Sequence, residues 1–317
     1  MNESLIAQAH AGRSAPLCIA IPGQPANVSI TLLYQGDLPD SSQIFIVQDP
    51  QGVARAVVQL SSPLAPDMVA RGIARARDAA AAMGPLLAPS VLLPTSEGDI
   101  GGRTYSVMPY CLALSSARLQ WHVERIRLRP VIFKWLRGIT STTKRPVGSA
   151  ELATGYELAL KRLLKFDLAN PFNAYTRRAL DRLTNASWSP MSVLMHGDLW
   201  KGNLLLRQTP ASLVRPRLSE RLAVIDWGAA KMQGYPFFDL VRVSESLRAS
   251  PKRLRAEALQ HGTLLGCDPV DSISYLLAAV GGLLGDHGEF PLDRLAGMAS
   301  SSLQTLLLAL PELQLPQ

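Results

Sequence analysis

The sequence has no long uninterrupted apolar run, only three cysteines, and no lysine in its first 133 residues. The longest late apolar stretch, SYLLAAVGGLLG, is too short to cross a bilayer and contains glycines, so no membrane span is expected. The cysteines lie far apart and lack the spacing of a metal site. Free thiols, and an N-terminus without the pattern of a signal peptide, lead us to expect a cytoplasmic protein.

Runs of basic residues are also missing, although the formal net charge is +7. Basic and aromatic residues do not alternate in a stripe, so the charge does not indicate a nucleic-acid partner. It indicates a mild attraction for anionic ligands. With 317 residues, of which 47% are apolar, the chain can form one large domain or two modest ones. The sequence does not indicate an oligomeric state.

The N-terminal part predicts strands around a single helix. β-branched residues separated by turn signals predict strands in NVSITLLYQ, QIFIVQ and VARAVVQL. A helix is expected in PDMVARGIARARDAAAAMG, beginning at Pro66 and Asp67 and ending at Gly84. A further strand pair is expected in EGDIGGRTYSVMPY, and together these elements form a small α+β unit.

After Cys111 apolar residues recur at helical spacing. The helical segments are RLQWHVERIRLRPVIFKWLRGI, SAELATGYELALKRLLKF, PFNAYTRRALDRLTNA, residues 236–248 and most of the C-terminal part, while TKRPVGSAE is expected to be a loop. We therefore predict two domains, residues 1–110 and residues 111–317, of which the second is mainly helical.

One short window, MHGDLWKGNLLL, concentrates polar groups that can carry chemistry. His196, Asp198 and Asn203 form H-x-D-x-x-x-x-N, and Asp226 begins D-x-G after the apolar run LAVI. An aspartate can accept a proton from a hydroxyl, and an amide oxygen with a second carboxylate can hold Mg²⁺. Pairing of the runs LLL and LAVI would bring these groups together. These are the parts that phosphoryl transfer needs, because its catalysis is mostly positioning and charge neutralisation.

A purely structural interpretation of the same residues is also open. In it Asp198 and Asn203 only make hydrogen bonds within a turn, and Asp226 caps a strand end.

HGDLWKGNLL and VIDWG resemble the catalytic and metal-binding motifs of the aminoglycoside phosphotransferase and choline kinase families, which are small-molecule kinases with a protein-kinase-like fold. GYPFFDLVRV, in which Asp239 begins a helix, resembles the segment after the metal-binding aspartate in those families. YSVMPYCL resembles the hinge between their two lobes. The resemblance, strongest over residues 190–245, implies an α+β bilobal fold with a small antiparallel-sheet N-lobe, one helix in that lobe, and a larger helical C-lobe.

The resemblance also implies ATP and Mg²⁺ as cofactors and a small-molecule hydroxyl as the phosphate acceptor. Asp198 corresponds to the catalytic base that orients this hydroxyl, and Asn203 and Asp226 correspond to the Mg²⁺ ligands. His196 is expected to hold the loop rather than to react. Lys201 either offsets charge on the transferred phosphoryl group or is an exposed, solvated lysine.

The hinge residues Met108, Pro109 and Cys111 are expected to contact the adenine. Pro109 has no N–H and can only accept a hydrogen bond from the adenine amino group. The backbone N–H of Cys111 is therefore the expected donor.

The pattern departs from an active kinase in one respect. Such enzymes carry a lysine on a small-lobe strand, which neutralises the α- and β-phosphates and pairs with a glutamate of the next helix. Here the corresponding position in RAVVQL is the neutral Gln59. Arg55, four residues earlier, is expected on the same face of the strand and is a candidate to reach phosphate. The next helix carries three arginines that either meet the phosphates or form a solvated face: Arg71, Arg75 and Arg77.

Three functions therefore compete. The first is an ATP- and Mg²⁺-dependent kinase for a sugar, a glycan precursor, an amino alcohol or an antibiotic. The second is a pseudokinase that senses nucleotide or acts as a scaffold, which the missing lysine favours. The third is nucleotidyl transfer on the same fold.

The acceptor itself is only weakly constrained. Acidic residues able to bind a cationic aminoglycoside are sparse in the helical part, which argues against a polycationic acceptor. Between Asn203 and Asp226, an extended hairpin is expected, or else a basic rim for an anionic acceptor; its arginines are Arg207, Arg215, Arg217 and Arg221.

Overall fold

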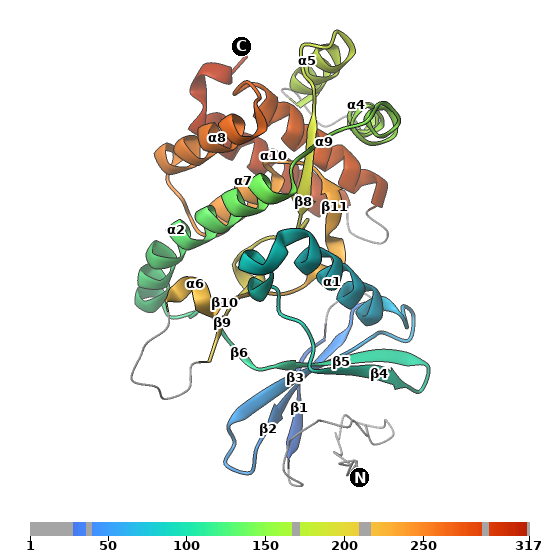
Figure 1. Cartoon of the computed structure of the whole chain (residues 1–317), viewed down its shortest axis with the longest axis vertical. Helices are drawn as coiled ribbons and strands as arrows, with labels where there is room; N and C mark the ends of the chain where they lie inside the picture. The colour runs from blue at the N-terminus through green and yellow to red at the C-terminus, as the bar shows by residue number, and fades with distance from the viewer. Residues whose placement is uncertain (1–27, 36–39, 167–171, 209–216, 287–291, 316–317) are drawn as a thin grey trace. The chain divides into compact units, whose positions relative to one another are not determined.

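The computed structural model describes residues 28–35, 40–166, 172–208, 217–286 and 292–315 (Figure 1). The chain divides into two compact units. Unit 1 comprises residues 1–80, 89–113 and 205–228, and unit 2 comprises residues 81–88, 114–204 and 229–317. The segment 205–228, which contains Asp226, thus belongs to unit 1 although it comes late in the sequence. The domain boundary that the sequence predicts between residues 110 and 111 remains a prediction.

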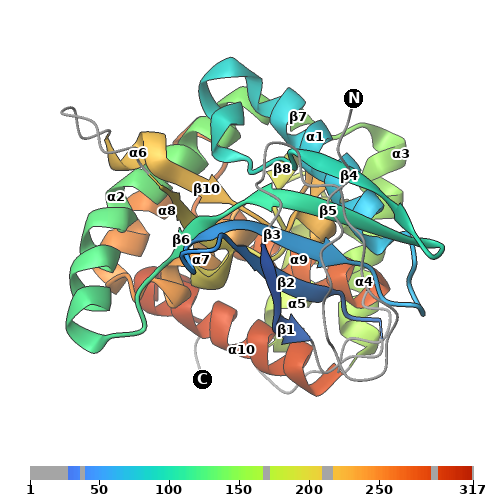
Figure 2. The same ribbon diagram turned by 90° about the horizontal axis from the view of Figure 1, so that it is seen from below.

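Unit 1 is built on a five-stranded antiparallel sheet with strand order β1-β2-β3-β5-β4, whose strands lie side by side in Figure 2. All five strands fall where the sequence predicts them. They are β1 (Ser29–Gln35), β2 (Gln43–Gln48), β3 (Ala54–Leu60), β4 (Ser96–Ile100) and β5 (Arg103–Pro109).

The side chains of β3 alternate between the two faces of the sheet. Ala56, Val58 and Leu60 alternate along the strand and are buried in a core with Phe45 and Val107. Because side chains of a strand alternate between faces, the residues between them point to the opposite side. The same-face placement expected for Arg55 and Gln59 therefore holds.

Helix α1 (Met68–Leu87) follows β3, as predicted. Gly84 has a φ of 70° and marks a kink, so regular helix ends where the sequence predicts its end. The apolar side of the helix is buried, while its three arginines, Arg71, Arg75 and Arg77, are exposed. This exposure fits a solvated face, the second of the two interpretations left open by the sequence, and phosphate contact by these arginines stays a prediction.

A small sheet in order β10-β9-β6 completes unit 1. Its strands are β6 (Cys111–Ala113), β9 (Leu204–Arg207) and β10 (Leu222–Val224), and the short helix α6 (Leu218–Arg221) precedes β10. The predicted pairing of the LLL and LAVI runs is thereby confirmed. Arg207 donates to the Pro89 carbonyl at 2.7 Å, and Arg221 donates to the Arg207 carbonyl at 3.2 Å. Arg215 lies outside the described residues, so the basic-rim interpretation stays a prediction.

Unit 2 is mainly helical, which confirms the expectation for this part of the chain. Its helices are α2 (Arg118–Thr143), α3 (Ser149–Glu151), α4 (Leu158–Lys165), α5 (Phe172–Thr184), α7 (Phe238–Ser246), α8 (Pro251–Leu265), α9 (Asp271–Asp286) and α10 (Leu292–Ala309), with a π-helical segment at Leu152–Glu157. Helix α8 shows clear end signals: the Ser250 hydroxyl accepts from the Arg253 N–H, and Gly266 ends the helix with a φ of 67°. No helix in the described ranges is long and apolar enough to cross a membrane.

A three-stranded sheet, β11-β8-β7, precedes the HGD motif in unit 2. Its strands are β7 (Arg145–Pro146), β8 (Met191–Met195) and β11 (Lys231–Gly234). The sequence predicts only a loop around β7, but Arg145 and Pro146 pair with β8, a contact between distant segments that local patterns do not reveal. Met191, at the start of β8, is held on both sides, since its N–H donates to the Tyr275 hydroxyl and its carbonyl accepts from the Tyr156 hydroxyl, both at 2.7 Å.

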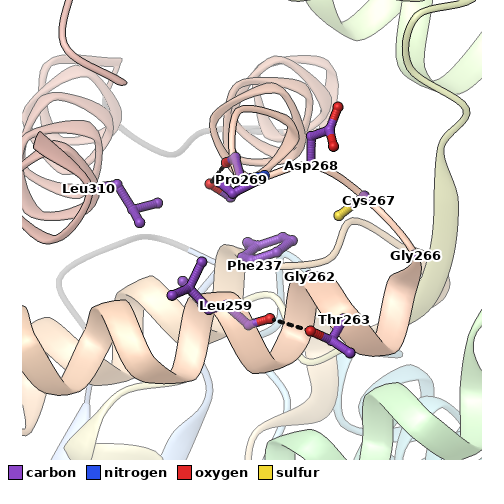
Figure 3. A pocket seen from close by; sticks show the side chains of 11 residues that line it. Phe237, Leu259, Gly262, Thr263, Gly266, Cys267, Asp268, Pro269 and Leu310 are labelled. Carbon is purple, nitrogen blue, oxygen red and sulfur yellow. Dashed lines mark hydrogen bonds between the residues drawn. The ribbon is translucent and has the colours of Figure 1, made fainter. Parts of the chain in front are cut away.

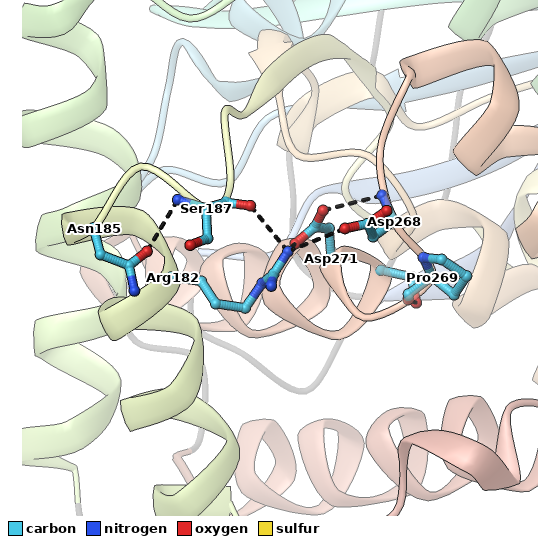
Figure 4. Close-up of polar contacts among 7 residues, drawn as sticks. Arg182, Asn185, Ser187, Asp268, Pro269 and Asp271 are labelled. Carbon is cyan, nitrogen blue, oxygen red and sulfur yellow. Dashed lines mark hydrogen bonds and ion pairs between the residues drawn. The ribbon is translucent and has the colours of Figure 1, made fainter.

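A buried ion pair joins α5 to α9 (Figure 4). The Arg182 guanidinium donates to Asp271 at 2.8 and 3.0 Å and to the Ser187 carbonyl at 3.0 Å. The Asp271 side chain is only 4% exposed, and burial raises its pKa although Arg182 lowers it. Removing Arg182 would leave the buried Asp271 carboxylate without its charge partner, so the pair helps to fix how these helices pack.

Candidate functional site

The HGD motif, residues 196–198, forms a tight loop directly after β8. Gly197 has a φ of 84°, a conformation that L-residues with side chains rarely adopt. A Cβ atom at this position would lie 2.5 Å from the Ala229 carbonyl oxygen. The glycine of HGD is therefore required by both backbone conformation and space, and it sets the turn that presents Asp198.

Asp239 fixes this loop from a distance of more than forty residues along the chain. Its two carboxylate oxygens accept the backbone N–H groups of His196, at 2.6 Å, and Gly197, at 3.0 Å. The side chain is buried, and this desolvation raises its pKa to about 7. The two backbone donors and Arg242 oppose the rise, and the negative charge of Asp198 adds to it. The sequence shows Asp239 at the start of a helix but gives no sign of this role.

The backbone conformation of Phe237 helps to position Asp239. The Phe237 φ of 69° is unusual for a bulky residue and redirects the chain at the start of α7. The Phe237 ring lines a cavity of about 310 Å³ together with Leu259, Cys267 and Leu310 (Figure 3). Burial of this ring holds the strained conformation in place, which puts Asp239 in the first turn of α7.

His196 and Asn203 shape the surroundings of Asp198. His196 is buried, and its Nδ1 accepts the Asp198 N–H at 3.3 Å, as suits a residue that holds the loop. Asn203 is 6% exposed, and its Nδ2 donates to the Asp198 carbonyl at 2.7 Å and to the Asp198 carboxylate at 3.1 Å. This leaves the Asn203 amide oxygen for a cation, while the amide nitrogen orients the carboxylate.

Lys201 points from the same loop toward α2. Its N–H donates to the Ser246 hydroxyl at 2.7 Å, and its ammonium lies 5.2 Å from the centre of the Trp121 ring. This is the geometry of a cation–π contact. Lys201 is exposed and lies against Trp121, which fits the interpretation of an exposed lysine, while charge compensation on a phosphoryl group stays a prediction.

Unit 1 contains a pocket of about 450 Å³ that holds three of the predicted residues: Gln59, Met108 and Asp226. Asp226 has a φ of 63°, which aspartate adopts more readily than most residues. Its side chain is exposed to the solvent of the pocket, yet desolvation by the protein around it raises its pKa, opposed by the backbone N–H of Gly228. A cation beside it would reverse this rise by favouring the charged carboxylate.

The other predicted nucleotide contacts are placed differently. Pro109 pairs with Ala56 in the ladder of β3 and β5, and Cys111 pairs with Arg207 across β6 and β9. Neither lines the pocket. The thiol of Cys111 is buried, which raises its pKa. Adenine contacts from Pro109 and Cys111 remain predictions.

Arg55 and Gln59, the candidates for the missing lysine, have separate partners. The Arg55 guanidinium is paired with Asp49 at 2.7 Å, at the turn between β2 and β3, and does not line the pocket. Gln59 lines the pocket, and its amide nitrogen donates to the Ser42 hydroxyl at 2.9 Å. Phosphate contact by either residue stays a prediction.

The pocket of unit 1 is also unusual in its charge. Helix α1 contributes only Met68, Val69, Gly72, Ile73 and Ala76 to the wall. Among the described residues that line the pocket there are two carboxylates, those of Asp40 and Asp226, and no lysine, arginine or histidine. A phosphate chain bound here would therefore depend on a cation from solution for charge balance.

The predicted metal ligands are of the right chemical kind. Asn203 and Asp226 supply an amide oxygen and a carboxylate, which suit Mg²⁺, a hard cation that usually keeps several waters and shares phosphate oxygens. In the described part of the chain no three residues among histidine, cysteine, aspartate and glutamate cluster as a metal site would need. The donor set therefore fits a cation shared with a nucleotide better than a metal held by protein alone.

Comparisons with known proteins identify a family and a similar fold. The sequence model of the phosphotransferase enzyme family matches residues 39–270. A choline/ethanolamine kinase family protein from Mesorhizobium loti has a similar solved structure, with 17% identity, coverage of 89% of this chain and 90% of that chain, and a TM-score of 0.50. At that identity the likeness shows the fold, which is the predicted kinase-like one.

More distant similarities are found to two further solved structures. A glucosamine kinase has 14% identity, covers 92% of this chain and 95% of its own, and gives a TM-score of 0.42. An aminoglycoside phosphotransferase from Streptomyces rimosus, in complex with ADP and streptomycin, has 12% identity, covers 75% of this chain and 90% of its own, and gives a TM-score of 0.40. No curated protein matches the chain.

Proposed function

Because the chain belongs to the phosphotransferase enzyme family, we propose that it transfers the γ-phosphoryl group of ATP, with Mg²⁺, to a hydroxyl of a small molecule. The observation that carries this proposal is the ordered surroundings of Asp198. Asn203 orients its carboxylate, and Asp239 holds the backbone just before it. A solvated turn aspartate would not need two such buried supports, so the purely structural interpretation is the weaker one.

In the proposed reaction Asp198 accepts a hydrogen bond from the acceptor hydroxyl and orients its oxygen toward the γ-phosphorus. As the new P–O bond forms and the bond to the bridging oxygen of ADP breaks, the hydroxyl proton passes to the Asp198 carboxylate. Such positioned acid–base groups contribute about 10²- to 10⁴-fold in rate. His196 and Asn203 keep the carboxylate in place.

Asn203 and Asp226 would hold Mg²⁺, which when bound neutralises phosphate charge and fixes the phosphate chain. The chemistry of the two side chains supports this assignment, since an amide oxygen and a carboxylate suit a hard cation.

A specific observation favours the alternative of a pseudokinase. The pocket of unit 1 has no cationic side chain among its described lining residues, and Gln59 stands where the usual lysine is expected. In this alternative the chain would bind nucleotide, or another ligand, without turnover.

Product analysis separates these functions. We expect ³¹P NMR of the protein with ATP, Mg²⁺ and a panel of small hydroxyl compounds to show ADP together with one new phosphate ester. Release of AMP with a nucleotidylated product would instead indicate nucleotidyl transfer. Bound ATP that stays intact with every compound would favour the pseudokinase.

A further inference from the structure

One face of α2 carries charge and an aromatic ring where a packed helix usually carries apolar residues. Arg118, Trp121, His122 and Arg125 recur at intervals of three and four residues and therefore lie on the same side of the helix. With Leu119 and Arg248 they line a pocket of about 360 Å³ in unit 2. We call this the basic pocket.

The arginines of the basic pocket lack counter-charges. In the residues that the structure describes, no carboxylate lines the pocket, and Arg118, Arg125 and Arg248 form no ion pair. The first turn of α2 has no acidic residue, and its N-cap, Ala117, has no side-chain hydrogen bond to offer. Helix N-termini in this condition attract anions through their free N–H groups.

Arg125 provides an independent sign of an incomplete site. Its Nη2 lies 2.8 Å from His122 Nδ1, and because arginine can only donate, His122 must accept there. Its Nε is buried and has no partner. A buried N–H without an acceptor costs about 1–3 kcal/mol, so Arg125 has donor capacity that its protein neighbours do not use.

The pocket is held together by α2 and the end of α7. Arg129, one turn beyond Arg125, donates to the Leu247 carbonyl at 2.8 and 2.9 Å and also to the Arg248 carbonyl. Arg248 has a φ of 50°, an uncommon conformation for this residue. Burial and the positive charge of Arg125 both lower the pKa of Arg129, which indicates that cations are crowded here.

The basic pocket adjoins the catalytic loop. Lys201 is three residues from Asp198 and places its ammonium over the ring of Trp121, which lines the pocket. Three residues keep the two Cα atoms within about 11 Å. The neighbouring Ser246 accepts the Lys201 N–H, so the loop is fixed against the same end of α7 that contributes Arg248.

We propose that the phosphate acceptor is itself a phosphate monoester, a small hydroxyl compound whose phosphate group binds in the basic pocket. Arginine forks match phosphate oxygens, and three of them beside Lys201 balance a dianion. The same charges repel a cationic acceptor of the aminoglycoside kind. This proposal rests on the proposed function, because it names the acceptor of that reaction.

The first test measures binding without nucleotide, so it does not depend on turnover. We expect calorimetry to show that glycerol 3-phosphate binds the full-length protein and that glycerol does not. Arg118→Gln and Arg125→Gln should each raise the Kd at least about tenfold, as loss of a charged hydrogen bond implies. Arg118 is exposed, so its variant should keep the fold. Arg127 is an exposed residue of the same helix outside the pocket, and Arg127→Gln should change the Kd less than twofold.

The second test measures ADP formation with glycerol, ribose and glucose, each beside its phosphate monoester. We expect the esters to have a kcat/KM at least about tenfold higher, with Arg125→Gln removing this preference through KM. Equal turnover of neutral and esterified acceptors would overturn the proposal and leave the kinase function intact. So would a Kd for glycerol 3-phosphate that is the same in the wild type and in both arginine variants. Absence of turnover together with absence of ATP binding would instead refute the kinase function, and the acceptor proposal with it.

Discussion

Replacement of Asp198 by asparagine is expected to lower kcat by about 10²- to 10⁴-fold, the usual contribution of a positioned acid–base group. The asparagine has the same shape but is a poor proton acceptor. Its amide can still fill the space beside Asn203, so the fold should be kept. ATP affinity should stay within about twofold, because the proposed role of Asp198 concerns the acceptor hydroxyl. The measurement is kcat from ADP release together with calorimetry of ATP.

A matched control is available on α5, where Asp181 is exposed and lies outside the loop. Asp181→Asn should leave both quantities unchanged. If Asp198→Asn kept more than about a third of the wild-type kcat, Asp198 would not be the base, and the proposed reaction would lose its main support.

Replacement of Asp239 by asparagine is expected to affect both stability and turnover. The carboxylate accepts one backbone N–H on each oxygen, from His196 and from Gly197. An amide offers only one acceptor, so one buried N–H would face an NH₂ group. The cost is about 1–3 kcal/mol of unfolding free energy. Because the displaced loop carries Asp198, kcat should fall at least about tenfold while KM changes little.

The ionisation of Asp239 should also be visible in how the unfolding free energy depends on pH. Burial raises its pKa to about 7, above its value of 3.8 in the unfolded chain, so between these values the folded state binds more protons. Unfolding free energy should therefore fall as pH rises from about 4 to about 7, by up to ~4 kcal/mol, and this contribution should be flat above that range. Urea unfolding across this range should show the slope in the wild type and in Asp181→Asn, and a smaller slope in Asp239→Asn. If the unfolding free energy had the same dependence on pH in all three proteins, the group responsible would not be Asp239.

The sequence predicts those parts of the fold that depend on local patterns. Alternation in β3 and the end of α1 at Gly84 follow from residue properties that act over a few positions. The two-residue strand β7 does not, because Arg145 pairs with Ser192 more than forty residues away. Local patterns likewise place Arg55 and Gln59 on one face of β3 but do not show that Asp49 occupies the guanidinium of Arg55.

The same distinction applies to the candidate site. HGD-x₄-N shows Asp198 and Asn203 because their roles lie within one short loop. The support from Asp239 depends on hydrogen bonds across the fold, which local patterns do not show. The basic pocket was missed for a similar reason. The spacing of Arg118, Trp121 and Arg125 is visible in the sequence, but Arg248 joins them only in the folded chain.

The measurement that most directly tests use of Mg²⁺ and ATP is calorimetry of ATP binding, with and without Mg²⁺, to the wild type and to Asp226→Ala. Since the described lining of the pocket in unit 1 contains no cationic side chain, the nucleotide should bind only with Mg²⁺. Asp226→Ala should weaken that binding at least about tenfold, the effect of losing a charged ligand. ATP binding that is the same without Mg²⁺ and in Asp226→Ala would contradict the proposed metal site and favour a pseudokinase.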